Sequence, residues 1–169
     1  VCGRRATKSV MTSIIVIYQI YQLLTLENPH AFFNLPNNQV IGIQICSNKV
    51  DSAFKLFKSI TSFITQSKAF SPFVSAIRAE EMWLQTQSFI DSKESGAIQG
   101  NLGNIRIASA FASPKIRGDS NLIVILDEIA HLRDSDTKGK EHFVDSDVYQ
   151  ALMPSTWGFV GDVNGVKKG

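Results

Sequence analysis

The order of hydrophobic and polar positions divides the chain into strands and helices. Apolar side chains alternate with polar or small ones over residues 40–46 and 104–110, which predicts two strands. Residues 122–126 are five consecutive apolar residues, three of them β-branched, between Asn121 and Asp127. Such a run is typical of a strand that is buried on both faces in the middle of a parallel sheet.

Two segments have the periodicity of amphipathic helices. In residues 9–26, apolar side chains recur at three- and four-residue intervals, and we expect this stripe to face the core. Its members are Ile14, Ile17, Tyr18, Tyr21 and Leu24. Residues 14–17 suit a strand equally well by propensity, but a helix is expected to follow the loop motif described below. In residues 48–66 the apolar face comprises Val50, Phe54, Phe57, Ile60 and Ile64.

The remaining segments are shorter or more polar. Pro29 and Pro36 predict a connection over residues 28–38, and Pro154 is expected to end a short helix over residues 147–153. Weaker patterns indicate a short strand over 81–86, a helical turn or loop over 88–94, a loop over 112–120 and a polar segment over 131–147. Strands that alternate with helical segments predict an α/β fold with a mostly parallel, helix-flanked sheet.

Length and composition bound the class of protein. The chain has 169 residues, enough for one domain with a sizeable core, and its net charge of +2 gives no strong basic field that would indicate nucleic acid. Cys2 and Cys46 are too few for a disulfide framework, which favours a reducing intracellular compartment. Val10–Leu26 is too short and too polar for a membrane span, and no signal peptide is recognisable, so no membrane partner is expected.

A degenerate phosphate-binding loop lies near the first residue. The standard motif, G-x-x-x-x-G-K-[ST], wraps phosphates in backbone N–H groups and places Lys on the phosphates and Ser or Thr on Mg²⁺. Here Cys2 and Thr7 stand at the two glycine positions, whereas Lys8 and Ser9 are intact. Thr7 is the larger departure, because a β-branched residue resists positive φ. The candidate nucleotide-binding residues are Gly3, Arg4, Arg5, Ala6, Thr7, Lys8 and Ser9.

Two adjacent carboxylates, Asp127 and Glu128, follow the apolar run. In a P-loop hydrolase the first acid holds Mg²⁺ and the second activates the attacking water. We therefore predict Ser9 and Asp127 as Mg²⁺ ligands and Glu128 as the catalytic base. Arg117, on the preceding loop, is a candidate to stabilise charge on the transferred phosphoryl group. Simpler interpretations stay open. The two acids could form a solvated acidic turn or stabilise a helix N-terminus, and Arg117 could be a solvated loop arginine.

With these motifs the chain resembles the ATPase domain of the large terminase subunit, the DNA-packaging motor of tailed bacteriophages. The resemblance is carried by residues 2–9, 45–57, 113–131 and 147–155, and the last two segments are the more specific. It implies a RecA-like P-loop fold of the ASCE type, ATP and Mg²⁺ as ligands, and hydrolysis that drives double-stranded DNA into a procapsid. It also implies that Arg117 acts across the subunit interface of a homo-oligomeric ring.

The resemblance further implies the portal protein and the small terminase subunit as partners. The corresponding location is the host cell cytoplasm, transiently at the portal vertex. The chain has no initiator Met, no strand before the loop and no nuclease domain, so we expect a fragment of the family's ATPase domain, truncated at both ends. Two other functions stay open. The first is another P-loop DNA motor, such as a helicase-like one, and the second is a degenerate module that lost hydrolysis through Thr7.

Overall fold

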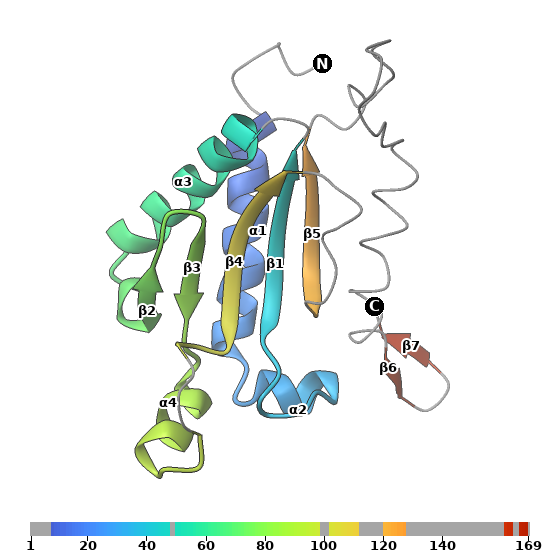
Figure 1. Ribbon diagram of the computed structural model, residues 1–169. Helices are drawn as coiled ribbons and strands as arrows, with labels where there is room; N and C mark the ends of the chain where they lie inside the picture. Colours follow the sequence, from blue (N-terminus) through green and yellow to red (C-terminus); the bar gives the residue numbers. More distant parts are fainter. Residues whose placement is uncertain are drawn as a thin grey trace, which may run out of the picture.

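A five-stranded sheet is the centre of the computed structural model, which describes residues 8–47, 50–98, 102–111, 120–127, 161–163 and 166–168 (Figure 1). The strands are β1 (Ile41–Ser47), β2 (Val74–Ile77), β3 (Glu81–Leu84), β4 (Ile105–Phe111) and β5 (Asn121–Asp127), and they lie in the order β2-β3-β4-β1-β5. A separate antiparallel pair comprises β6 (Gly161–Val163) and β7 (Val166–Lys168). The α/β class predicted from the sequence is confirmed.

The central part of the sheet is parallel. β1 pairs in parallel with β4 on one side and with β5 on the other, so that Ile43 lies beside both Ile107 and Ile123. Every residue of β1 is buried, as expected of a strand with neighbours on both sides. β3 continues the sheet antiparallel to β4, and β2 is antiparallel to β3. The mostly parallel core is therefore as predicted, whereas β2 was not foreseen.

The described helices are α1 (Lys8–Thr25), α2 (Pro29–Phe33), α3 (Val50–Gln66) and α4 (Gln87–Glu94), with a 3-10 turn at Ser71–Phe73. None of them is both long enough and apolar enough to cross a membrane. The predicted connection over residues 28–38 was wrong in part, because it contains α2. The Asn28 side chain accepts a hydrogen bond from the Ala31 N–H, Pro29 occupies the first turn, and Asn34 ends the helix with φ 55°. The turn-forming residues thus cap a short helix.

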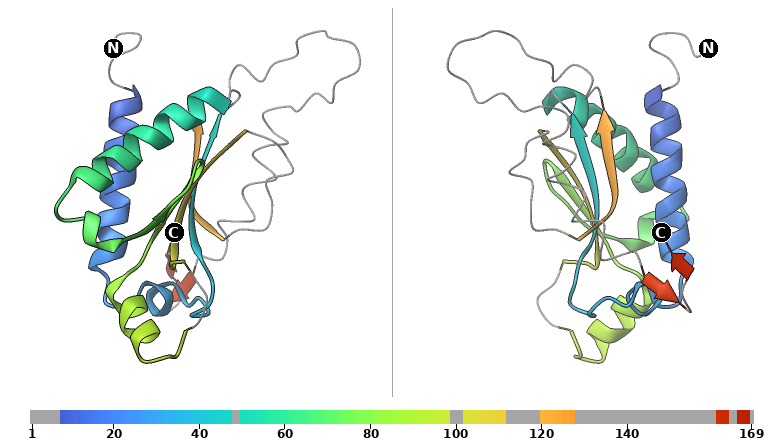
Figure 2. Two further views of the ribbon diagram at one scale, coloured as in Figure 1. Left: turned by 60° about the vertical axis from the view of Figure 1, so that its left-hand side comes forward. Right: turned by 90° about the vertical axis from the view of Figure 1, so that its right-hand side faces the viewer.

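The helices α1 and α3 lie on one face of the sheet, as both views in Figure 2 show. Alternate residues of the strands point to this face and form the core with one side of each helix. The core residues from the strands are Ile41, Ile43, Ile45, Met82, Leu84, Ile105 and Ile107. Of the apolar face predicted for α3, Phe57, Ile60 and Ile64 are buried, whereas Val50 at the first turn is 53% exposed.

The buried side of α1 differs from the prediction. Its buried residues are Ser13, Val16, Ile20 and Leu23, with Ile17 and Leu24 partly buried. Ile14, Tyr18 and Tyr21, which the periodicity assigned to the core, are exposed. The helix is apolar on both sides, so spacing alone could not determine which side packs on the sheet.

The position of β5 is a second correction. We predicted a strand in the middle of the sheet, but β5 is the last strand on its side within the part of the sheet that the structure describes. Asn121 is buried and the six residues that follow are half-buried. At the start of this pairing, Gly42 leaves no room for a side chain, because a Cβ atom would collide with Asn121 and the Ser120 carbonyl oxygen.

Candidate functional site

The parallel strands β1, β4 and β5 end at the same edge of the sheet, at the top of Figure 1. Asp127 is the last residue of β5 and Lys8 is the first residue of α1. The Lys8 ammonium nitrogen lies 2.5 Å from Oδ1 of Asp127. Lys8 and Asp127, which we selected from the sequence as candidate site residues and which lie far apart along the chain, are therefore in contact.

The alternation of β5 decides where the Asp127 carboxylate points. Ile123, Ile125 and Asp127 share the side of the strand that faces the helices, and the two isoleucines pack against the core. Asp127 continues this row beyond the apolar part, and its side chain keeps 18% of its surface exposed. The carboxylate is thus held by a strand that packs below it while it remains open to a ligand.

The start of α1 supplies the opposite charge. The first turn of α1 contains no acidic residue, and the Lys8 side chain is 70% exposed. The amino end of a helix also carries partial positive charge, because its first N–H groups have no partner within the helix. Ser13 ties this end to the rest of the fold, since its hydroxyl donates to the Ser9 carbonyl oxygen and lies 3.3 Å from Ser59 Oγ of α3. The result is a fixed, cationic helix start that suits an anion such as phosphate.

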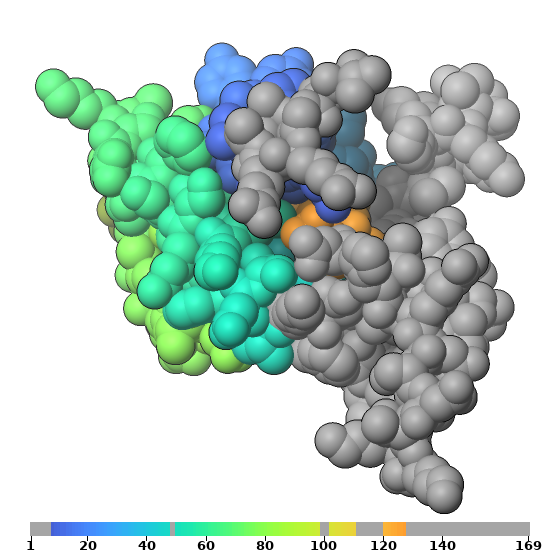
Figure 3. Space-filling model, turned by 90° about the horizontal axis from the view of Figure 1, so that it is seen from above, coloured from blue at the N-terminus to red at the C-terminus, as the bar shows by residue number. Residues whose placement is uncertain are grey.

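Seen from above, the orange end of β5 is visible beside the blue start of α1 (Figure 3). The exposed lysine and the partly exposed carboxylate therefore lie at the surface. An ion pair this exposed contributes about 0 to 1 kcal/mol to folding. The pair therefore contributes little to the stability of the fold.

The residues present fit a magnesium ion that is held mainly by water and phosphate. No group of three or more His, Cys, Asp and Glu residues within the described part of the chain could hold a metal ion alone. Mg²⁺ does not require such a cage, because it is commonly bound by one or two carboxylates and keeps several waters. Asp127 offers a carboxylate, and Ser9, exposed beside Lys8, offers a hydroxyl.

Of the predicted site residues, the structure brings Lys8 and Asp127 into contact, and Ser9 directly follows Lys8. The other predicted site residues lie outside the described part of the chain, and these are Gly3, Arg4, Arg5, Ala6, Thr7, Arg117 and Glu128.

Sequence reasoning missed Ser47 at this edge. Ser47 is the last residue of β1, is fully buried, and lies opposite Asp127 in the strand pairing. The sequence did contain an indication of its position. Ser47 follows Ile41, Ile43 and Ile45 at every second residue, so its hydroxyl lies on the same side of β1, after the last of these isoleucines.

Cys46, one residue earlier, is not suited to chemistry. It is fully buried, and this burial raises the pKa of its thiol to about 11. Because the thiolate is the nucleophile and the metal ligand, Cys46 is unreactive near neutral pH.

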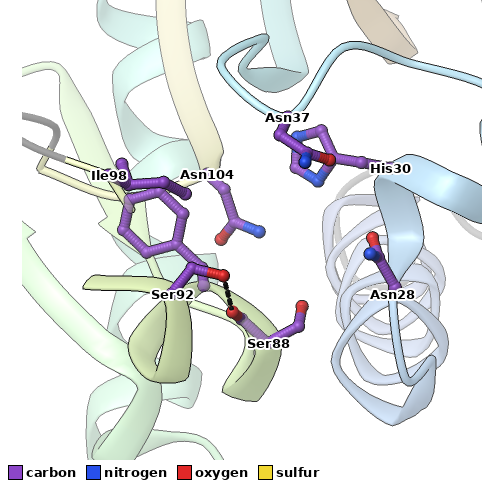
Figure 4. Close-up of a pocket in the computed structure, with 8 residues that line it drawn as sticks. Asn28, His30, Asn37, Ser88, Ser92, Ile98 and Asn104 are labelled. Atoms are coloured by element: carbon purple, nitrogen blue, oxygen red, sulfur yellow. Dashed lines mark hydrogen bonds between the residues drawn. The ribbon is translucent and has the colours of Figure 1, made fainter. Parts of the chain in front are cut away.

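A small polar pocket lies at the opposite end of the sheet, between α2 and α4 (Figure 4). Its lining residues are Asn28, His30, Asn37, Ser88, Phe89, Ser92, Ile98 and Asn104. Several of their polar atoms already serve the fold. His30 Nε2 lies 2.7 Å from the Gln39 carbonyl oxygen, and Asn104 accepts from the Thr86 N–H and donates to its hydroxyl. The cavity of about 40 Å³ is far below the several hundred Å³ typical of ligand sites.

A comparison with known protein families gives a match over most of the chain. The family model described as "Uncharacterized protein MJ0330, N-terminal P-loop domain" matches residues 1–155. The match spans the helix start at Lys8, the strand end at Asp127 and the loop motif before them. No curated protein matches the chain significantly.

Proposed function

Since the chain belongs to the family of the MJ0330 N-terminal P-loop domain, we propose that it binds ATP with Mg²⁺ and hydrolyses it. P-loop domains generally bind nucleotides, and the observation that carries the proposal is the contact between Lys8 and Asp127. It joins the lysine of the loop motif to the carboxylate at the end of an apolar strand, the two parts that phosphoryl transfer needs beside each other.

The proposed roles follow from the chemistry of each side chain. Lys8 leaves Asp127 when the nucleotide arrives and neutralises its outer phosphates, which the start of α1 also attracts. Ser9 and Asp127 would hold Mg²⁺, which when bound neutralises charge on the phosphate oxygens. Glu128 accepts a proton from the attacking water at its carboxylate. Arg117 stabilises the charge that develops on the transferred phosphoryl group.

The finer proposal is a DNA-packaging ATPase. It is supported by the resemblance of residues 113–131 and 147–155 to the large terminase subunit. On this proposal hydrolysis moves double-stranded DNA into a procapsid, the chain works in a homo-oligomeric ring, and Arg117 reaches the site of a neighbouring copy. The portal protein and the small terminase subunit are the corresponding partners.

Calorimetric titration of ATP, with Mg²⁺ or with EDTA, tests the coarser proposal. We expect binding that Lys8→Ala abolishes, and Glu128→Gln should keep binding while losing most turnover. Equal turnover in Glu128→Gln and the unaltered protein would exclude Glu128 as the base. If a folded chain binds no ATP but Thr7→Gly does, the loop is degenerate as it stands and the protein does not hydrolyse ATP.

A second assay tests the finer proposal by measuring turnover with added nucleic acid. A packaging motor should be stimulated by double-stranded DNA and not by single strands. Stimulation by single-stranded DNA alone would favour a helicase-like motor and contradict the packaging role. The mixture of Arg117→Ala and Glu128→Gln copies tests the ring, because an arginine acting between copies should restore part of the turnover lost by each variant alone.

A further inference from the structure

The outer side of α1 is an apolar surface with no described element upon it. Six large hydrophobic residues of α1 are each about half exposed, and we refer to them as the outer α1 face. They are Val10 (47%), Met11 (54%), Ile14 (50%), Ile15 (57%), Tyr18 (56%) and Tyr21 (52%). The right-hand view of Figure 2 shows α1 at the outer boundary of the molecule, with the sheet on its inner side.

The outer α1 face is continuous and uncharged. Met11, Ile14, Tyr18 and Tyr21 follow one another at intervals of three and four residues, so they form a single stripe along the helix. No charged residue occurs between Lys8 and Glu27. A helix that is apolar all round is normally buried on both sides, whereas α1 buries only the side of Val16 and Ile20.

The exposed area is that of an interface core. If each of the six side chains has about 200 Å² when fully exposed, their half-exposed surface is on the order of 600 Å². The largest apolar patch on a typical monomer is about 300 to 600 Å² and often has a function. A stable dimer buries about 800 Å² on each partner, and its core is mainly apolar. The outer α1 face therefore provides most of the area that one side of such an interface requires.

We propose that the outer α1 face binds the same face of a second copy of this chain. Each copy would contribute α1 about a two-fold axis, the commonest symmetry of protein pairs. The absence of charge allows the face to meet itself, because no like charges are brought together. Tyr18 lies near the middle of the stripe and Tyr21 towards one end, and tyrosine is enriched in the cores of such contacts.

The proposed pairing leaves the candidate nucleotide site accessible. Lys8 lies one turn before Met11, at the end of the helix, and its side chain is engaged by Asp127 of β5. Pairing through α1 does not rest on nucleotide hydrolysis. It is also a different interface from the one through which Arg117 would reach a neighbouring copy, because a two-fold contact joins the same face of two copies.

Sedimentation equilibrium of the full chain tests the pairing. We expect a mass of two copies at micromolar concentrations, and Tyr18→Glu should weaken the pair by about 100-fold or more, since it buries a charge at the centre of each face. The matched control is Thr65→Glu, which adds the same charge to the exposed face of α3. Circular dichroism shows whether both variants keep the folded state.

Three outcomes would overturn the proposal. They are a single copy at 100-fold higher concentration, a pair that Tyr18→Glu leaves intact, and a larger assembly that Tyr18→Glu leaves intact. A conservative second variant covers the case in which Tyr18→Glu does not fold. Ile15→Ala with Tyr18→Ala removes apolar area without adding charge, and it should also dissociate the pair. Lys8→Ala should remain paired, so loss of ATP binding and loss of pairing are separate results.

Discussion

Replacing Asp127 with asparagine is expected to separate nucleotide binding from folding. The two side chains have the same shape, so the amide would keep the packing at the end of β5. The change removes one negative charge, and with it the ion pair to Lys8 at 2.5 Å. The fold should therefore persist, while any ligand that relies on that charge should bind less tightly.

The structure gives the expected size of each effect. Since Lys8 is 70% exposed, the pair should contribute no more than about 1 kcal/mol to folding, a shift in Tm of about 2 to 4 °C. A charge-assisted contact to a bound ion is worth more, about 1.5 to 3 kcal/mol. Its loss corresponds to about 10- to 150-fold in Kd for ATP with Mg²⁺.

Titration calorimetry with and without Mg²⁺ distinguishes the two residues. Asp127→Asn should lose the advantage that Mg²⁺ gives, yet bind ATP in EDTA at least as well as the unaltered protein, because Lys8 is then free of its partner. Lys8→Ala should lose binding under both conditions. The matched control is Glu81→Gln, which has similar exposure and breaks the ion pair of Glu81 with Arg78 at 2.8 Å and its longer contact with Arg106 at 4.0 Å.

Two results would refute this reasoning. Full Mg²⁺-dependent binding by Asp127→Asn would show that the carboxylate does not hold the ion. A fall in Tm much larger than that of Glu81→Gln, with ATP affinity unchanged, would show that the ion pair serves the fold.

Three further predictions concern the fold. Gly42→Ala should lower the free energy of unfolding by about 1 to 3 kcal/mol in urea denaturation, because the new Cβ would displace the buried Asn121 side chain and crowd the Ser120 backbone carbonyl oxygen, and an unchanged midpoint would contradict the close packing. Asn104→Ala should cost a similar amount by leaving the buried Thr86 N–H without its acceptor, and a thermal melt indistinguishable from the parent would show otherwise. Because burial raises the pKa of Cys46 to about 11 from 9.0, its contribution to stability is complete below pH 9 and is lost towards pH 11. Cys46→Ala should flatten that part of the stability–pH curve, and an identical slope in both proteins would argue against the shift.

The strands and the longer helices could be predicted because burial imposes a period on the sequence. The alternation over residues 40–46 and 104–110 and the apolar run before Asp127 correspond to β1, β4 and β5. The short elements were harder. β2 has only four residues, half-buried and exposed in turn, and α2 is a five-residue helix whose capping residues are also those of turns.

Which surface of an element is buried could not be predicted where both surfaces are apolar. Ile14 and Val16 are both strongly hydrophobic, yet one is exposed and the other is buried, because only the sheet decides which side of α1 it contacts. The same applies to β5, whose five apolar residues do not specify how many strands lie beside them.

Two members of the candidate site could be selected from the sequence by their residue type and by their position at a loop motif or a strand end. Lys8 and Asp127 were selected separately by the loop motif and the strand end, and the structure places them in contact. The predicted roles of Glu128 and Arg117 stay predictions, since both residues lie outside the described part of the chain. Ser47 was missed because a single serine after an apolar strand carries no motif.

The contact between Lys8 and Asp127 also links affinity to folding. It joins the first helix to a strand more than a hundred positions later, so the two groups come together only when α1, β1 and β5 are all docked. A ligand that bridges them binds the native chain alone, and at 100 times its Kd it adds about 2.7 kcal/mol to the free energy of unfolding. Conversely, in a marginally stable variant, a core substitution such as Ile43→Ala would lower the apparent affinity for that ligand without touching it, by depopulating the state that binds. Nucleotide titrations of variants in this protein thus measure the integrity of the sheet as well as the chemistry at its edge.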